Sequence, residues 1–431
     1  MDDSIYDALI VGGGPGGSTA ATFLARAGHR VLVLEKESVP RFRIGESLLP
    51  DSREIFRDMG VWPALEAVGF PRKFGAQFHL ANGSKSHRFR FAEGAFARES
   101  MALQVERARF DPLLLAHART CGAEVREGWT ARRFDHATDG VTVEAIDSDG
   151  TSRAVRGRFL VDATGRTNLT GGQEGLRMPH PRHRKYAVYG HFEGVERDPG
   201  EAGGDTVIVR GADHWFWIIP VSDTKTSVGW VGEKSALAAC AGDPAAVFRR
   251  AVEASSVMRR RLGASRLLGE IRTTADFSYF NRRFVGDRLL RIGDAAGFMD
   301  PIFSAGVHLA MWSGRLAAEA VSAALVAGND GRAGLARYAR RVDRAMRLYW
   351  RFVEHYYTAP FMELFLAPRP GLRLPSAVVS ILGGNLEPPW TIRWRLEVFF
   401  LLVRIQAHRA LAPRISFADA AGGTSVPGGA P

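Results

Sequence analysis

The sequence has little cysteine and no long apolar run, and each shortage excludes a class of protein. Cys121 and Cys240 lie far apart and lack C-x-x-C spacing, so we expect neither a disulfide framework nor a cysteine zinc site. The longest late apolar run, residues 398–403, is much shorter than the roughly 20 residues of a bilayer span. Residues 1–3, MDD, are acidic rather than a basic leader. We therefore expect a cytoplasmic protein without a transmembrane segment.

Lysine is also scarce, since only six of the 57 basic residues are lysine. The net charge of +11 is spread along the chain, and no basic run is interleaved with aromatic residues, so nucleic acid is not an expected partner. A basic surface suits an acidic protein partner or simple solubility. With 431 residues, 46% of them hydrophobic, the chain is long enough for a two-lobed body with a large core.

The N-terminal region has a glycine-rich turn between two apolar segments. Residues 5–11 form a strand-length apolar run, and residues 12–17, GGGPGG, fit G-x-G-x-x-G. A helical stripe follows, and a second apolar strand over residues 30–34 ends at Glu35, 18 residues beyond the last motif glycine. This order of strand, turn, helix, strand and acid predicts a dinucleotide-binding unit.

The glycines have separate roles in such a unit. Gly12 allows the tight turn, Gly14 lets the backbone approach a pyrophosphate, and Gly17 lets helix and strand touch. Glu35 accepts a hydrogen bond from a ribose hydroxyl.

Two later strand ends carry polar turns. Short strands over residues 124–129, 140–146 and 153–161 end in Asp162-Ala163-Thr164-Gly165-Arg166, which returns the chain to the nucleotide-binding sheet. A further strand runs into residues 293–306. There Asp294 is placed to accept from a sugar hydroxyl, and the amides of residues 304–306 start a helix and can seat an anion. A capped strand-to-helix turn without a ligand is the alternative.

Residues 214–220, HWFWIIP, predict a strand that presents Trp215 and Trp217 on one face. Composition alone leaves open whether the two indoles belong to the core or to a cofactor wall. Residues 331–417 are helical and aromatic, as expected of a lid or docking segment, and residues 418–431 predict a flexible tail.

Taken together, these motifs resemble those of the flavin-dependent halogenases, relatives of the FAD monooxygenases and the geranylgeranyl reductases. The similarity covers about the first 330 residues. The glycine motif, Glu35, Asp162 to Gly165 and Gly293-Asp294 imply FAD. Residues 215–220 match W-x-W-x-I-P, and Lys73 with Gly75 and Phe78 resembles the family's lysine motif. Residues 40–48 and 300–309 are also similar to that family.

The resemblance implies an α/β (α+β) fold with an FAD-binding, Rossmann-like domain of the GR2 type. The FAD domain is expected at residues 1–80, 100–170 and 270–330, an inserted antiparallel β-rich substrate domain at 81–99 and 171–269, and a helical segment at 331–417. The residues implied in FAD binding are Gly12, Gly14, Pro15, Gly16, Gly17, Glu35, Lys36, Arg43, Ile44, Gly45, Glu46, Ser47, Arg107, Asp162, Gly165, Asp294, Pro301 and Gly306.

The chemistry implied by the resemblance uses reduced FAD, O2 and chloride or bromide to make hypohalous acid. The halide is held near Ser304, Ala305 and Gly306, and Trp215 and Trp217 keep the substrate away from the flavin. Lys73 receives the hypohalous acid, as a haloamine or through a hydrogen bond. Arginine cannot replace it because a guanidinium stays protonated, whereas a buried lysine can lose its proton.

One departure from the family narrows the substrate. Tryptophan halogenases carry a glutamate where this sequence has Phe303, and a threonine where it has Ala305. A phenol ionises and a pyrrole is electron-rich already, so neither needs that carboxylate. The resemblance therefore implies a phenol or pyrrole of secondary metabolism, free or tethered to a carrier protein, rather than free tryptophan.

Partners and alternatives complete the expectations. The chain has one nucleotide fingerprint, so we expect a separate NAD(P)H flavin reductase to supply reduced FAD. His180 and His183 have no third ligand, and no metal site is expected. An FAD monooxygenase, a prenyl-lipid reductase and a non-catalytic flavoprotein remain open as alternative functions.

Overall fold

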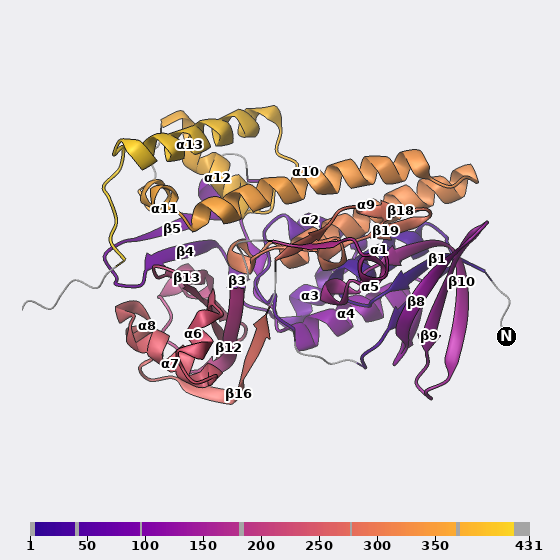
Figure 1. Ribbon diagram of the computed structural model, residues 1–431, viewed down its shortest axis with the longest axis horizontal. Helices are drawn as coiled ribbons and strands as arrows, with labels where there is room; N and C mark the ends of the chain where they lie inside the picture. The colour runs from indigo at the N-terminus through magenta and orange to yellow at the C-terminus, as the bar shows by residue number, and fades with distance from the viewer. Residues whose placement is uncertain are drawn as a thin grey trace, which may run out of the picture.

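The structure is a computed structural model, and it describes residues 5–38, 43–94, 97–180, 185–275, 278–367 and 371–417. Two large sheets form the body, and long helices cover one side of it (Figure 1). The predicted tail 418–431, residues 40–42 of the halogenase-like loop, and His183 lie outside the described residues.

The first sheet is built around the glycine-rich unit. Its order is β18-β19-β10-β1-β2-β7, and β1 is parallel to both β2 and β10. β1, β2 and the end of β10 are buried, which explains their near-continuous Val, Leu and Ile sequences. β9 and β8 extend β10 as an antiparallel hairpin. The bounds are β1 Tyr6–Val11, β2 Val31–Glu35, β7 Glu124–Glu127, β8 Thr130–Ala137, β9 Gly140–Ile146, β10 Ser152–Asp162, β18 Val285–Gly286 and β19 Leu289–Arg291.

The second sheet has the order β16-β12-β15-β14-β13-β4-β5 and is antiparallel except at β13 and β4. β4 pairs here, although the sequence analysis placed residues 75–80 with the FAD domain, and β16 also continues past residue 270 into this sheet. β4 and β16 belong to this sheet because they pair with β13 and β12, which are distant in the sequence. The bounds are β4 Gly75–Leu80, β5 Ser86–Arg90, β12 Lys185–Glu193, β13 Thr206–Arg210, β14 Trp215–Pro220, β15 Lys225–Glu233 and β16 Arg266–Ala275.

Two small sheets and short helices connect these bodies. The small sheets pair β3 with β6, and β11 with β17 and β20. Residues 52–68 form two helices, because Gly60 ends the first in the left-handed conformation and Pro63 stands in the first turn of the second. The bounds are β3 Arg72–Lys73, β6 Ala102–Leu103, β11 Arg177–Pro179, β17 Tyr279–Asn281, β20 Gly297–Phe298, α2 Ser52–Met59, α3 Trp62–Val68, α4 Arg107–Thr120, α5 Leu169–Gln173, α6 Ser235–Ala238, α7 Pro244–Glu253 and α8 Ser256–Leu262.

Helix α9, Gly306–Ala327, packs against α1, Pro15–Arg26, at very close range. A Cβ on Gly16 would lie 2.9 Å from the carbonyl oxygen of Ala310, and one on Gly314 would lie 2.5 Å from that of Gly16. In the described part of the chain, α9 alone is long and apolar enough to cross a bilayer, but 56% of its apolar window is buried inside the protein. It is therefore a core helix by packing.

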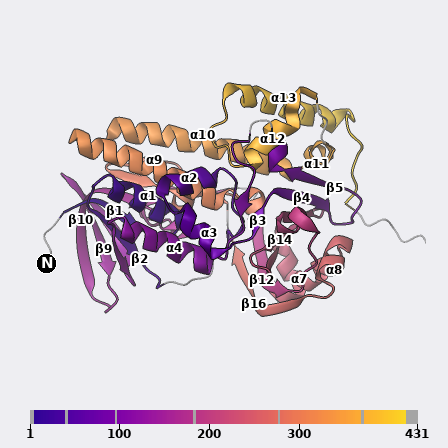
Figure 2. The same cartoon turned by 180° about the vertical axis from the view of Figure 1, so that it is seen from behind.

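The C-terminal helices continue this layer. α10, Arg332–Tyr356, runs along α9, and α11, α12 and α13 gather at its end above β4 and β5, as both views show (Figures 1 and 2). Their bounds are Ala359–Phe365, Leu374–Leu382 and Trp390–His408. The aromatic residues of α10 face the core, since Tyr349, Phe352 and Tyr356 are buried.

Candidate functional site

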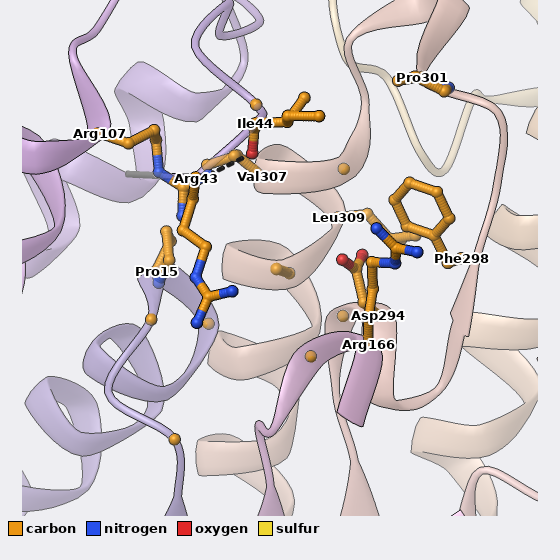
Figure 3. A pocket seen from close by; sticks show the side chains of 18 of the residues that line it. Pro15, Arg43, Ile44, Arg107, Arg166, Asp294, Phe298, Pro301, Val307 and Leu309 are labelled. Carbon is orange, nitrogen blue, oxygen red and sulfur yellow. Dashed lines mark hydrogen bonds between the residues drawn. The ribbon is translucent and has the colours of Figure 1, made fainter. Parts of the chain in front are cut away.

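A cavity of about 820 Å³ lies where the two large sheets meet the start of α9. Figure 3 shows Pro15, Arg43 and Arg107 on one side of it, with Asp294, Arg166 and Phe298 on the opposite side. Most of the site residues predicted from the sequence line this one cavity. They are Gly12, Gly14, Pro15, Gly16, Glu35, Lys36, Arg43, Ile44, Gly45, Glu46, Ser47, Arg107, Gly165, Trp215, Trp217, Asp294, Pro301, Ser304, Ala305 and Gly306.

The glycine turn forms one end of the cavity. Gly12 has φ +106°, and a Cβ there would lie 2.3 Å from the carbonyl oxygen of Ala163. A Cβ on Gly17 would lie 1.9 Å from the carbonyl oxygen of Gly12, so Gly17 shapes the turn from behind without lining the cavity. Both positions need glycine, as the dinucleotide-binding turn requires.

The carboxylate of Glu35 closes the turn. Its Oε2 accepts from the backbone N–H of Gly13 at 2.6 Å, and Oε1 accepts from that of Glu37 at 2.9 Å. The side chain thus stands at the strand end expected for a ribose contact. Asp162, by contrast, does not line the cavity: its two oxygens accept from the N–H and hydroxyl groups of Thr164 and Thr170. Its role in this structure is to hold the strand-end turn.

Arginine side chains and loop backbone meet on the same side of the cavity as Pro15 (Figure 3). Arg107 binds both carboxylate oxygens of Asp111, at 2.6 and 2.8 Å, and donates to the carbonyl of Ile44 at 2.9 Å (Figure 3). Gly45 has φ +108°, and a Cβ there would lie 2.9 Å from the Arg107 guanidinium. Arg107 therefore fixes the loop at residues 44–45 against the cavity. Arg43 lines the same wall and pairs with Glu37.

Asp294 lies across the cavity beside Arg166 (Figure 3). Burial raises the pKa of its carboxyl to about 6, although Arg166 and Arg107 lower it. At neutral pH the group is mostly ionised and can accept a hydrogen bond.

The predicted anion turn lies between a short 3-10 helix, Pro301–Phe303, and the start of α9. Asp300 accepts from the N–H of Ile302 at 3.2 Å, and Ser304 adopts the left-handed conformation at φ +56°. α9 then begins at Gly306, and residues 304–306 line the cavity. The first amides of a helix have no partner within it and attract negative charge. These residues can hold an anion.

The two tryptophans form a buried wall of the same cavity. Trp215 and Trp217 are 1% and 4% exposed, and their ring centroids lie 5.9 Å apart. The Trp215 indole donates to the Tyr357 hydroxyl at 2.9 Å, and that hydroxyl donates to Asp300 Oδ2 at 2.6 Å. Burial raises the pKa of Asp300 to about 6, while the bond from Tyr357 lowers it. Tyr357 thus links the tryptophan wall to the anion turn.

Lys73 is buried next to the cavity, but its side chain is not part of the cavity lining. Its Nζ donates to Ser47 Oγ at 2.9 Å and to the carbonyl of Leu48 at 3.2 Å, and it lies 5.4 Å from the ring centroid of Phe91. Burial lowers the pKa of Lys73 to about 7, although Asp205 raises it. Lys73 does not line the cavity, but Ser47 does. One hydroxyl therefore separates the amine from the cavity.

Several lining residues were missed by the sequence analysis. Arg166 was seen only as part of a turn, and β8 with its Thr130–Arg132 contribution was not predicted. Tyr349 and Val353 of α10 also line the cavity, so the C-terminal segment is part of the wall. No motif marks them, since helix packing brings them there. Across the described ranges, no group of three or more His, Cys, Asp or Glu side chains could hold a metal ion.

The glycine turn, Glu35 and the cavity fit a bound dinucleotide, which defines the class as an FAD-binding protein. The family described as "FAD binding domain" matches residues 5–352. The 1H-pyrrole-2-carbonyl-(peptidyl-carrier protein) chlorinase of Pseudomonas fluorescens is 30% identical over 408 residues, which cover 90% of each chain. The corresponding brominase of Pseudoalteromonas luteoviolacea is 34% identical over 384 residues, 88% of this chain and 92% of that protein.

A third relative, the tryptophan 2-halogenase of Chondromyces crocatus, is 34% identical over 355 residues, 80% of this chain and 66% of that protein. The solved flavin-dependent brominase Bmp2 superposes with a TM-score of 0.83 at 29% identity, over 94% of this chain and all of that one. The chain belongs to the FAD-binding domain family and, within it, to the flavin-dependent halogenases. It is a flavin-dependent oxidoreductase with FAD as cofactor, which confirms the family resemblance seen in the sequence.

Proposed function

We propose that this protein halogenates an electron-rich aromatic ring, a pyrrole carried as an acyl group on a carrier protein. The observation that carries the proposal is the buried amine of Lys73, which donates to the hydroxyl of Ser47. Ser47 lines the cavity, and so does the anion turn at residues 304–306. The two relatives named for carrier-bound pyrrole match about nine tenths of both chains, which supports the substrate class.

Bound FAD, when reduced, would supply two electrons that activate O2, so that O2 oxidises chloride or bromide to hypohalous acid while its other oxygen atom leaves as water. Gly12, Glu35 and Arg107 hold the loops around the cofactor, and residues 304–306 hold the halide. Trp215 and Trp217 exclude water and keep the ring away from the flavin, because both indoles are large, apolar and buried. A separate flavin reductase supplies the electrons.

Lys73 takes up the oxidant in this proposal and delivers it to the ring. A pKa of about 7 leaves much of the amine unprotonated at neutral pH, so it can accept halogen or donate a hydrogen bond to hypohalous acid. Phe303 supports a pyrrole over an indole, since its ring lines the cavity and packs 5.7 Å from Tyr356 where a catalytic carboxylate would otherwise stand.

The test is a product analysis. The FAD-loaded enzyme receives a flavin reductase, NADH and bromide, with free phenols, free pyrroles, tryptophan and pyrrole-2-carbonyl-loaded carrier protein. A bromine isotope pair on the carrier-bound pyrrole is expected. An added oxygen atom instead would mean monooxygenase chemistry, and reduction of a prenyl chain in a parallel assay would mean a prenyl reductase; either result contradicts the proposal.

A further inference from the structure

Exposed apolar side chains gather on one helix far from the glycine turn. Within the described ranges, six large hydrophobic side chains are exposed, and four lie on or beside α13. Trp390 is 70% exposed, Leu401 53%, Ile405 38% and Leu372 60%, and the carbonyl of Leu372 accepts from Arg395 of α13 at 2.9 Å. Single exposed apolar residues are ordinary, but a cluster of this kind marks an interaction site.

Three of these residues and the partly exposed Trp394 form an apolar stripe along α13, which we call the α13 stripe: Trp390, Trp394, Leu401 and Ile405. Their spacing of four, seven and four residues puts them on one side of the helix. The rings of Trp390 and Trp394 lie 6.5 Å apart. The opposite side of α13, including Phe399 and Phe400, is buried, so the stripe is not needed for folding onto α11 and α12.

The border of the stripe is positively charged. Arg393 and Arg404 are exposed, and beside the larger effect of Arg351 the charge of Arg404 also lowers the pKa of the Glu397 carboxyl. The one acid between them, Glu397, is bound by both guanidinium arms of Arg351. An aromatic centre with an arginine rim is the usual composition of a protein-binding surface.

The stripe lies on the outer face of the layer that closes the cavity. Phe400, on the underside of α13, has its ring 5.0 Å from that of Phe352, and Phe352 lies 6.0 Å from Phe303, which lines the cavity. Two ring contacts therefore connect α13 to the site. In Figures 1 and 2 α13 lies at the outer edge of the helical layer, and no other labelled helix or strand lies beyond it.

We propose that the α13 stripe docks the acidic carrier protein that presents the substrate, an inference that rests on the proposed function. A carrier attaches its acyl group through an arm joined by a phosphodiester, so its docking surface must offer cations as well as apolar contact. Arg393 and Arg404 supply that charge complementarity, and Trp390 supplies the anchor.

The experiment measures binding and turnover separately. The FAD-loaded enzyme is titrated with a fluorescently labelled peptidyl-carrier protein carrying pyrrole-2-carbonyl, and anisotropy gives Kd. KM and kcat for bromination are measured with the same carrier and with the N-acetylcysteamine thioester of the same acid. We expect Trp390→Ala to weaken carrier binding about 30-fold. Arg404→Glu should weaken it about tenfold, and less at high salt.

Activity on the small thioester and the melting temperature should stay at the wild-type level in both variants. Val326→Ala is the matched control, because Val326 is 82% exposed but lies at the end of α9. Wild-type Kd in the stripe variants would overturn the proposal. The proposal would also be overturned if the stripe variants bound the carrier normally but lost binding to phosphatidylglycerol vesicles, or lost a dimer that sedimentation detects in the wild type.

The two proposals can fail independently. If the wild type binds the carrier through α13 but never brominates the pyrrole, the proposed function is wrong and the docking surface stands. If it brominates the carrier-bound pyrrole and the stripe variants match the wild type, the docking surface is wrong and the function stands.

Discussion

Replacing Lys73 with methionine tests how burial sets the state of the amine. Methionine keeps an unbranched chain of similar length and removes the charge. Burial lowers the pKa of Lys73 from 10.5 to about 7, so the unfolded chain binds this proton more tightly than the folded protein does. That difference corresponds to about 5 kcal/mol of unfolding free energy lost when Lys73 is protonated in both states. The loss of unfolding free energy has its full value below pH 7, and it falls to zero as the pH rises toward 10.5.

We therefore expect Lys73→Met to be more stable than the wild type at neutral pH, with an advantage that shrinks as the pH rises. Between pH 7 and pH 9 the difference should narrow by about 2 kcal/mol, because only the unfolded wild type still binds the proton there. The lost hydrogen bonds to Ser47 and Leu48 reduce the advantage by an amount that does not depend on pH.

Urea unfolding of the FAD-loaded proteins at several pH values measures this difference. Lys234→Met is the matched control, because Lys234 is exposed and its removal relieves no desolvation. A stability difference that stays constant from pH 7 to pH 9 would refute the argument, since it would mean that Lys73 keeps an ordinary pKa.

Three other predictions follow from the site. The rate of bromination by the wild type should rise with pH through about 7 as Lys73 loses its proton. The Lys73→Ala variant should still bind FAD and oxidise it when reduced, yet make no halogenated product. Retained halogenation would remove the lysine from the mechanism. Tyr357→Phe should lower the free energy of unfolding by about 2 to 4 kcal/mol, because Trp215 loses its hydrogen-bond acceptor and Asp300 loses a donor. The variant should also release more peroxide per flavin oxidised. A wild-type peroxide yield would argue that Tyr357 does not connect Trp215 to the anion turn. Gly12→Ala should abolish FAD retention, read by flavin absorbance after gel filtration, because no Cβ fits at that φ; normal retention would show that the turn can move.

The sequence predicted residues that the structure brings together at one end of the cavity, because short-range chemistry determines their positions. The glycine turn, Glu35 and Arg107 are fixed by neighbouring residues or by one strand pairing, and they line the cavity together. The halogenase motifs also led to Trp215 and Trp217. Asp162 was assigned to FAD through the family resemblance, and only the structure shows that Thr164 and Thr170 donate to its oxygens.

Residues placed by long-range packing could not be predicted in the same way. Tyr357 follows Trp215 by 142 positions, and its hydroxyl group has no sequence signature. The same holds for Val353, which reaches the cavity because α10 lies along α9. The separation of Lys73 from the cavity by Ser47 depends on the pairing of β3 with β6, a two-residue ladder too short to predict.

The hydroxyl of Tyr357 limits where the C-terminal helices can be exchanged between related enzymes. It lies just after α10 and yet binds both the Trp215 indole of the second sheet and Asp300 in the turn before α9. A chimera that exchanges the C-terminal helices to acquire a new substrate would also exchange this bond, and with it the contact between Trp215 and Asp300 through Tyr357. Exchanges that begin after residue 358 would keep this contact.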